Sequence, residues 1–419
     1  MRGICIFEDA GYAGLLPLTH NRASYQLRLG MYTLLERILR HYPGNVSISL
    51  FAREHLAGTL RERYPHHMIN TLDPEADGYL FINGRTLDLE QVPLDADGKD
   101  KIVVWEDTLV YARLGKKASS DLSPDSFLNN RLFKPGQKTP AFQIEYRFAN
   151  HIWDIVKTNC EELNKDCGAF PKGKKIQGNV HEGVHMLNPQ KIFVGKGSSV
   201  KPGCVLDAEE GPVYIDSDVE VMPNAVITGP VYIGKGSTVL PAARLRQGTN
   251  VGEGCKVGGE ISNSILHSHS NKQHDGFLGD SYVGSWVNIG AGTSTSNTKN
   301  TYGTVKAQLG RGKKPVDTKA TFFGSAIGDH TMVGINMSLD AGTHIGCHSN
   351  VAGTGPVPKF LPAFTWFTDG NPRIYNMRHA FIVASRAMAR RDKIMTAAEE
   401  SMYQEIFALT TKDRKGMRK

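Results

Sequence analysis

An aliphatic side chain recurs every six residues through the second half of the chain, and this period constrains the fold more than any other feature. Hexapeptide repeats of this kind form a β-helix, in which three short strands make one triangular coil and each strand points one aliphatic side chain inward. The sequence therefore predicts a β-helix, which we bound at residues 176–360. The period is carried by Val194, Val200, Leu206, Ile215, Val221, Ile227, Ile233, Val239, Leu245, Val251, Val257, Val283, Ile289, Ile327, Val333, Leu339, Ile345 and Val351.

Small residues mark the corners of the predicted coils. The chain holds 44 glycines, concentrated after residue 190, and a glycine often follows the aliphatic residue. One coil cannot fold alone, because its inward side chains return roughly 1.5–3 kcal/mol each against roughly 1.5 kcal/mol per ordered residue. Stacked neighbouring coils supply the missing stability. The repeated aliphatic residues are therefore core, and we assign them no chemistry.

The period is broken at residues 208–212, 259–282 and 293–326. We expect the first break to be a small bulge and the other two to be loops ejected from a rigid prism. Loops on a rigid scaffold are where binding and catalytic residues concentrate. Functional residues are therefore expected in the second and third breaks.

Residues 1–175 have a different pattern, in which apolar runs alternate with helical periodicity. Such alternation predicts an α/β domain with a mainly parallel sheet covered on both faces, joined to the β-helix by a linker at 169–178. Residues 361–419 predict one amphipathic C-terminal helix, over 376–409, and a disordered basic tail. The expected front strands are Ile4–Phe7, Val46–Phe51, Tyr79–Ile82 and Ile102–Trp105, and the expected helices are Tyr32–His41, Ala57–Arg63 and Phe148–Leu163.

Composition excludes several classes of partner. A net charge of +7 over 419 residues is too low a charge density to indicate nucleic-acid binding, although it is compatible with a phosphorylated substrate. No uncharged apolar run approaches the ~18 residues of a membrane span. The six cysteines are scattered without a Cys-x-x-Cys pair, which favours a reducing compartment. We expect a cytoplasmic protein that binds neither membrane nor nucleic acid.

The second break leads into a run of short motifs. A histidine at 274 is followed by Leu278-Gly279-Asp280, then by Asn-Ile-Gly-Ala-Gly-Thr at 288–293 and an asparagine at 297. Residues 190–355 resemble, in motif order and on the same repeat scaffold, the acetyltransferase half of the bifunctional UDP-N-acetylglucosamine pyrophosphorylase/glucosamine-1-phosphate N-acetyltransferase family. The resemblance implies a left-handed β-helix, a homotrimer and an acetyl-CoA site between subunits.

The resemblance also implies roles for single residues. His274 matches the general base, and an imidazole with a reference pKa near ~6.5 suits removal of a proton from a sugar ammonium at neutral pH. Asn288 and Asn297 match sugar contacts, with the alternative that they cap turns or stack as a ladder between coils. Lys272 and Phe277 also fall at the substrate, although Phe277 replaces the tyrosine of the family.

On the cofactor side, the resemblance implies that the backbone N–H of Ala291, beside Gly290, stabilises the thioester oxyanion. Ser325 matches a serine on the coenzyme A side. The third break carries six cations, of which we assign Lys313 and Lys314 to the phosphates of the coenzyme. A solvated basic loop explains the same residues equally well. The cations are Lys299, Lys306, Arg311, Lys313, Lys314 and Lys319.

The front domain resembles a worn sugar-1-phosphate nucleotidyltransferase, because Leu16-Pro17-Leu18-Thr19 is retained while the glycine-rich phosphate loop is incomplete. If nucleotidyl transfer survives, the nucleotide contacts would be Gly14, Arg22 and Asn83. In that case alone Mg²⁺ is expected as a cofactor. Arg85 stands near the position of the metal-binding aspartate, and an arginine cannot bind the metal.

The function we predict is transfer of an acetyl group from acetyl-CoA to the amine of an amino-sugar phosphate such as glucosamine-1-phosphate. It would be coupled to nucleotidyl transfer if the front domain is active. Two alternatives remain at this stage. One is a non-catalytic trimerisation scaffold for a sugar-nucleotide binding domain. The other is a zinc hydratase, because His267 and His269 lie on one side of a strand and His269-x4-His274 has the spacing of paired ligands. A catalytic zinc needs a third protein ligand, and no histidine stands between His185 and His267 to supply it from another coil; the main prediction assigns no metal ligands.

Overall fold

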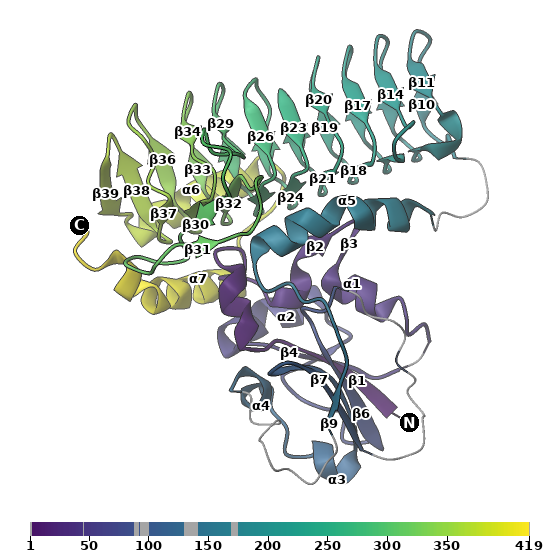
Figure 1. Ribbon diagram of the computed structural model, residues 1–419, viewed down its shortest axis with the longest axis vertical. Helices are drawn as coiled ribbons and strands as arrows, with labels where there is room; N and C mark the ends of the chain where they lie inside the picture. The colour runs from purple at the N-terminus through teal and green to yellow at the C-terminus, as the bar shows by residue number, and fades with distance from the viewer. Residues whose placement is uncertain are drawn as a thin grey trace.

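The computed structural model describes residues 2–44, 46–87, 92, 100–129, 141–168 and 175–418. It contains an α/β front domain, a long parallel β-helix and two C-terminal helices that contact both (Figure 1). The predicted linker at 169–178 lies largely outside the described residues. Among the described residues, no helix combines the length and hydrophobicity that crossing a bilayer requires.

The front domain is built on a seven-stranded sheet in the order β5-β4-β1-β6-β8-β7-β9. The central strand β1 pairs in parallel with β4 and β6, while β8 is antiparallel to both β6 and β7. The sheet is therefore mixed. Its strands are β1 (Arg2–Phe7), β4 (Ile48–Phe51), β5 (Met68–Ile69), β6 (Gly78–Asn83), β7 (Lys101–Trp105), β8 (Thr108–Gly115) and β9 (Ala141–Gln143), and a small ribbon is made by β2 (Arg28–Leu29) and β3 (Tyr32–Thr33).

The four strands predicted in this domain are present, but β8 was missed. It follows β7 after a tight turn in which Glu106 adopts a left-handed φ of 49°. That short connection forces the antiparallel pairing. The helices are α1 (Leu34–Leu39), α2 (Ala57–Arg63), α3 (Lys116–Ser119), α4 (Pro124–Leu128) and α5 (Ile152–Gly168), with 3-10 turns η1 (Ala10–Leu15), η2 (Ser24–Gln26) and η3 (Glu54–Leu56).

The β-helix is a prism with three sheets, which are parallel apart from one antiparallel strand at the C-terminal end of one of them. We call the sheet that packs on the front domain the domain face, the one under α6 the helix face, and the third the open face. The domain face consists of β12 (Ile192–Val194), β15 (Val213–Ile215), β18 (Val231–Ile233), β21 (Thr249–Val251), β24 (Ile265–Leu266), β27 (Tyr282–Val283), β32 (Ser325–Ile327), β35 (Thr343–Ile345) and β37 (Phe360–Leu361).

The helix face consists of β10 (Asn179–Val180), β13 (Ser199–Val200), β16 (Glu220–Val221), β19 (Thr238–Val239), β22 (Lys256–Val257), β25 (Asn271–Lys272), β28 (Asn288–Ile289), β33 (Met332–Val333), β36 (Asn350–Ala352), β38 (Thr365–Thr368) and β39 (Asn371–Ile374). The open face consists of β11 (His185–Leu187), β14 (Val205–Asp207), β17 (Val226–Thr228), β20 (Arg244–Leu245), β23 (Glu260–Ser262) and β26 (Phe277–Gly279), and is continued by β29 (Ser294–Thr295) and β34 (Ser338–Leu339). A 3-10 turn, η4 (Pro189–Lys191), precedes β12.

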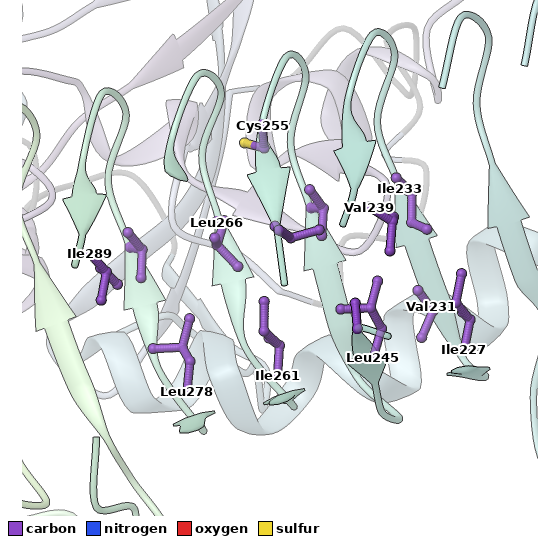
Figure 2. Close-up of a cluster of buried hydrophobic side chains, with 14 of the residues drawn as sticks. Ile227, Val231, Ile233, Val239, Leu245, Cys255, Ile261, Leu266, Leu278 and Ile289 are labelled. Carbon is purple, nitrogen blue, oxygen red and sulfur yellow. The ribbon is translucent and has the colours of Figure 1, made fainter. Parts of the chain in front are cut away.

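The six-residue period sets the core of the prism, as predicted. The periodic aliphatic residues form one continuous buried cluster that runs the length of the β-helix. Figure 2 shows a part of this cluster, with labelled residues from Ile227 to Ile289. Because each strand contributes one inward side chain, stacking the coils removes that side chain from water on both sides.

The second break in the period is not an ejected loop, which corrects the prediction. Residues 259–282 form ordinary coil strands, β23 to β27, with shorter corners. Leu245, Ile261 and Leu278 follow each other at 16 and 17 residues instead of 18, so the chain keeps its three faces while the sequence loses its period. The bulge at 208–212 joins β14 to β15 as expected.

The third break does leave the prism. It forms an antiparallel hairpin of β30 (Lys306–Ala307) and β31 (Val316–Asp317). Val305 and Ala307 are buried against Leu15, Leu18 and Trp153 of the front domain. The inner side of the hairpin therefore packs between the two domains, while its turn is exposed.

The C-terminal region also differs from the prediction. Strands β37 to β39 extend the prism to Ile374, beyond the expected boundary at residue 360, and two helices follow in place of one: α6 (Met377–Ala389) and α7 (Ala397–Leu409). Helix α7 packs on α2 of the front domain. The tail is ordered at its start, because Arg414 in the 3-10 turn η5 (Thr411–Arg414) is buried and donates to the carbonyl oxygen of Ala363 at 3.0 Å.

Candidate functional site

His274 lies at the corner where the helix face turns into the open face, between β25 and β26, and its side chain is exposed. The next coil supports this corner closely. The N–H of Gly292 donates to the carbonyl oxygen of Asp275 at 2.9 Å. Gly276 has a φ of 120°, and a Cβ there would lie 2.2 Å from the carbonyl oxygen of Thr293. The corner therefore accepts only glycine at 276, and the imidazole projects from a rigid support.

The corner stacked against it holds Gly290 and Ala291, the residues predicted on the acetyl-CoA side. It is a run of small residues, Gly290-Ala291-Gly292, with Ala291 half-buried and Gly292 exposed. The run itself carries no side chain larger than a methyl group, and on its far side the Asn336 side chain lies against Gly292, where a Cβ would be 2.0 Å from Asn336 Oδ1. The structure thus brings the predicted base and the predicted oxyanion donor to adjacent coils of one corner.

Lys272 lies inside the prism, which does not fit a substrate contact. It pairs with the inward Val257 on the preceding coil and is fully buried. Burial lowers the pKa of its ammonium to about 8. The Nζ atom donates to the carbonyl oxygen of His274. Lys272 therefore holds the backbone of the corner from within.

Phe277 and Asn297 meet on the open face. The ring of Phe277 lies over Gly279, where a Cβ would be 2.4 Å from the ring and 3.0 Å from Asn297 Nδ2. Asn297 Nδ2 donates to Asp280 Oδ2 at 2.7 Å, and Asn263 Nδ2 donates to Asp280 Oδ1 at 2.7 Å. Burial raises the pKa of Asp280, and the two amide donors oppose that rise. Asn297 is thus partly engaged in a ladder between coils, the alternative considered from the sequence.

Two arginines on the open face were missed by the sequence analysis. Arg244 of β20 pairs with Glu260 of β23, which pairs with Phe277 of β26. Arg244 Nε lies 3.6 Å and Arg246 Nη1 lies 3.1 Å from the Glu260 carboxylate. Two guanidinium groups share one carboxylate, which leaves positive charge beside Phe277. The Arg-Leu-Arg alternation around the inward Leu245 was the available signal.

Asn288 lies around the corner from Phe277 and Asn297, on β28 of the helix face. It lines a pocket of about 390 Å³ between this face and α6. Gln273, the neighbour of His274, lines the same pocket. The structure therefore divides the predicted sugar contacts between two faces, with His274 at the corner between them.

The remaining predicted cofactor residues do not reach this corner. Ser325 is fully buried in the domain face, where the adjacent Ala326 packs on the front domain. Lys313 and Lys314 are exposed in the turn of the β30–β31 hairpin. The Nζ atom of Lys157 in α5 donates to the carbonyl oxygen of Thr318 at 3.0 Å and holds the hairpin against α5.

The three histidines of the zinc alternative diverge. His267 Nε2 lies 3.0 Å from the Tyr282 hydroxyl in the buried domain interface, where burial drives the pKa of His267 well below its usual value. His269 stacks on Trp286 with ring centres 4.3 Å apart. His274 lies at the next corner. Within the described ranges, no group of three or more His, Cys, Asp or Glu side chains is arranged to hold a metal ion.

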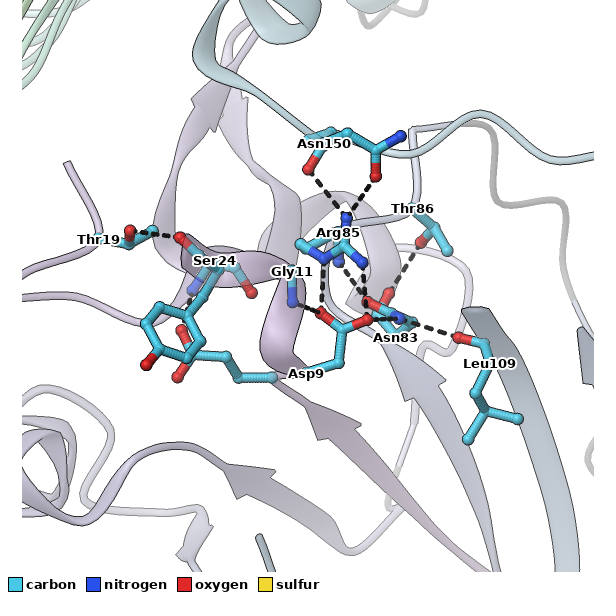
Figure 3. A network of polar contacts seen from close by, with 12 residues as sticks. Asp9, Gly11, Thr19, Ser24, Asn83, Arg85, Thr86, Leu109 and Asn150 are labelled. Atoms are coloured by element: carbon cyan, nitrogen blue, oxygen red, sulfur yellow. Dashed lines mark hydrogen bonds and ion pairs between the residues drawn. The ribbon is translucent and has the colours of Figure 1, made fainter. Parts of the chain in front are cut away.

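In the front domain, the carboxyl ends of β1 and β6 are filled by a buried ion pair (Figure 3). The Asp9 carboxylate accepts from Arg85 Nε at 2.6 Å and from Arg85 Nη2 at 2.7 Å. Asn83 Nδ2 donates to Asp9 Oδ2 at 2.9 Å and to the carbonyl oxygen of Leu109 at 2.9 Å. Arg85 Nη1 is satisfied by Asn150. Asn83 therefore serves this network, and the Asp9 oxygens are occupied.

The other two predicted nucleotide contacts are also covered. A Cβ on Gly14 would lie 2.0 Å from the carbonyl oxygen of Asn150, so the 148–151 segment lies directly against this backbone. Arg22 is buried and forms an ion pair with Asp329 of the prism. The donor set at this sheet edge does not fit Mg²⁺, because its aspartate is committed to an arginine at both oxygens.

Comparisons with known proteins find similarity over parts of the chain. The family described as sugar nucleotidyl transferase matches residues 4–175. The bifunctional protein GlmU of Cupriavidus pinatubonensis is 30% identical over 170 residues, covering 35% of this chain and 37% of that protein. The GlmU of Bartonella quintana is 26% identical over 309 residues, covering 69% and 62% respectively. The chain thus spans about a third to three fifths of the length of these relatives.

Among solved structures, the UDP-N-acetylglucosamine acyltransferase from Campylobacter jejuni overlaps 58% of this chain and 82% of its own, at 12% identity and a TM-score of 0.22. The β-helical architecture described above rests on strand pairing within this chain. The chain is therefore similar to GlmU proteins over part of its length, and its residues 4–175 match the family described as sugar nucleotidyl transferase.

Proposed function

We propose that the protein transfers an acetyl group from acetyl-CoA to the amine of an amino-sugar phosphate, at the corner that carries His274. The single observation that supports this most is the adjacency of the His274 corner and the Gly290–Gly292 corner, joined by the Gly292–Asp275 hydrogen bond. An exposed base and an accessible backbone then flank one point on the prism surface.

Each group at the corner has one role in the proposed reaction. The His274 imidazole accepts a proton from the sugar ammonium, and the freed amine nitrogen attacks the thioester carbonyl carbon. The Ala291 N–H faces the oxygen that gains negative charge. The C–N bond forms as the C–S bond breaks, the imidazolium returns its proton to the leaving sulfur, and the nitrogen releases its second proton to water as it becomes the amide. Acetyl-CoA supplies the activated acyl group when bound.

The open face supports a phosphorylated acceptor. Arg244 and Arg246 carry more positive charge than Glu260 neutralises, and guanidinium groups bind phosphate through paired N–H donors. Phe277 offers an apolar surface to the sugar ring. We include assembly into a homotrimer in the proposal, because His274 is exposed on a single copy and a neighbouring prism would supply the opposite wall.

We propose no nucleotidyl transfer by the Asp9, Asn83 and Arg85 set. A phosphate group or Mg²⁺ at this edge would have to displace Arg85 from Asp9, and the buried charges would then lose their partners. The front domain instead contributes the interface that holds the prism.

The test is acetyl transfer by the purified full chain, with acetyl-CoA and glucosamine-1-phosphate as substrates and release of the free thiol as the signal. His274→Ala should lower the rate at least ~100-fold, the lower end for loss of a general base. His185→Ala removes an equally exposed histidine from the first coil of the open face and should leave the rate unchanged. No turnover by the folded wild type with any amino-sugar phosphate would leave a scaffold as the function.

A further inference from the structure

A separate feature of the prism is the pocket on the helix face, which the proposed reaction does not use for its phosphate. Its floor is formed by strands β22, β25, β28 and β33, and its wall by α6 and the residues just after that helix. At about 390 Å³ it has the size of a site for a small metabolite.

The pocket concentrates positive charge without a counter-charge. Lys256 from the floor and Arg386, Arg390 and Arg391 from the wall all line it, and no lining residue is acidic. In the part of the chain that the structure describes, none of the four forms a salt bridge. Arg386 and Arg390 stand four residues apart on α6, so they share one face of the helix. Like charges held this close repel, and an anion would relieve that repulsion.

The polar groups in the pocket specify more than charge. Asn271, Gln273 and Asn288 line the floor with side-chain amides, which both donate to and accept from hydroxyl groups. Arg391 Nη2 already donates to Asn271 Oδ1 at 2.9 Å, which fixes one guanidinium against the floor. The pocket thus offers cations for phosphate on one side and amides for hydroxyls on the other.

The aromatic residues argue against a nucleotide base as the second part of the ligand. The faces of Trp286 are taken by His269, with ring centres 4.3 Å apart, and by His330, at 6.2 Å. Bases bind proteins largely by stacking on open aromatic faces, and Trp286 offers its edge instead. Burial, followed by the charges of Arg391 and Lys393, lowers the pKa of His269 to about 4, so this ring adds no charge near neutral pH.

We propose that the helix-face pocket is a second ligand site, distinct from the acetyl-transfer corner, that binds a phosphorylated sugar through the α6 arginines and the floor amides. The phosphate lies against Arg386, Arg390 and Lys256, and the sugar hydroxyls face Gln273 and Asn288. A nucleoside has no open aromatic surface to occupy here.

Binding is measured by calorimetry on the full chain with glucose-1-phosphate, which carries no amine and cannot be acetylated. To keep the open face out of the measurement, the background protein is the Arg244→Gln/Arg246→Gln variant. Adding Arg386→Gln and Arg390→Gln should weaken binding at least tenfold and reduce its salt dependence. Arg378→Gln, an exposed arginine on the same helix but outside this pocket, is the matched control and should bind as the background does.

Glucose, inorganic phosphate and uridine separate the parts of the ligand. We expect glucose and uridine not to bind, and inorganic phosphate to bind more weakly than glucose-1-phosphate. Binding that survives Arg386→Gln/Arg390→Gln, or the absence of any binding of glucose-1-phosphate to a folded background protein, overturns the proposal. The measurement needs no turnover, so its failure is distinguishable from failure of the acetyl-transfer proposal.

Discussion

The front domain and the prism place arginines beside a potential ligand site in opposite ways. At the strand ends of the front domain, Arg85 is paired with Asp9 and buried, so the charges cancel inside the fold. On the helix face of the prism, Arg386 and Arg390 line a pocket that holds no carboxylate. In the front domain the arginine charge is neutralised by an aspartate of the same chain, so it is not available to a ligand. In the pocket of the prism none of the described lining residues is acidic, so the arginine charges are available to an anionic ligand.

The largest expected effect comes from breaking the front-domain pair. Arg85→Ala leaves the Asp9 carboxylate buried without its cation, and should lower the free energy of unfolding by about 3–5 kcal/mol. Arg390→Ala removes an exposed arginine and should change it by less than ~0.5 kcal/mol. Chemical denaturation of both variants measures the difference. Equal effects would show that the two arginines are not used differently.

The pH dependence of the same pair provides its own check. Although burial pushes the pKa of Asp9 upward, the hydrogen bonds and the charge of Arg85, with help from Asn83 and Gly11, lower it overall. A carboxyl group whose folded pKa is depressed contributes stability above its unfolded pKa of ~3.9 and loses it as the pH falls through the folded value. Arg85→Ala should therefore be less sensitive to acid below pH ~4 than the wild type.

Replacing Lys272 should have an intermediate effect on the free energy of unfolding. Its buried ammonium donates to a backbone carbonyl oxygen and not to a carboxylate. Lys272→Met should stabilise the prism by about 1 kcal/mol at neutral pH, because a buried charge is exchanged for an apolar chain of similar length. Burial lowers the folded pKa to about 8, below the unfolded value of ~10.4. The unfolded chain therefore binds more protons between these values, and wild-type stability should rise with pH there relative to the variant.

That comparison needs denaturation curves at pH 7.5 and pH 9.5 for both proteins. The advantage of Lys272→Met should shrink at the higher pH, where the wild-type lysine is already neutral in the fold. An advantage that is constant or grows with pH would mean that the ammonium is better solvated than its place inside the prism indicates.

The smallest expected effect on stability concerns the two unpaired arginines of α6. Arg386→Gln/Arg390→Gln should raise the free energy of unfolding by a few tenths of a kcal/mol at low salt, because two like charges four residues apart are removed. The gain should vanish near 1 M salt, where the screening length falls to ~3 Å. Thermal unfolding at two salt concentrations measures it, and a loss of stability would mean that these arginines already have partners.

The sequence predicted the prism well because its core is periodic. Each inward position is six residues from the next, so the side chains that must be buried could be named one by one, and they form the buried cluster. The same logic failed at Lys272. A polar residue at an inward position, together with shortened corners, made the regular strands β23 to β27 look like an ejected loop. A sequence period shows where aliphatic residues recur. It cannot distinguish a strand that is absent from a strand whose inward aliphatic residue has been replaced by a polar one.

The front-domain ion pair and the helix-face pocket were harder to predict, because both depend on contacts between residues far apart in the chain. Asp9 and Arg85 are 76 positions apart, and Arg391 meets Asn271 across 120. Nothing in the Arg-x-x-x-Arg-Arg run of the C-terminal helix indicates which sheet that helix will cover. By contrast, His274 and the Gly290–Gly292 run belong to successive coils, and the repeat itself brings them together.

The way the front domain lies on the prism has a consequence for how copies of the protein can meet. One of the three sides is occupied within the same chain, where Ile265, Tyr282 and Ala326 are buried against α5 and its surroundings, and α6 overlies part of another. Within the described residues, the side that carries Arg244 and Phe277 is the one that neither the front domain nor α6 covers. The faces through which two copies can contact each other are thus limited by the parts of the same chain that cover the prism.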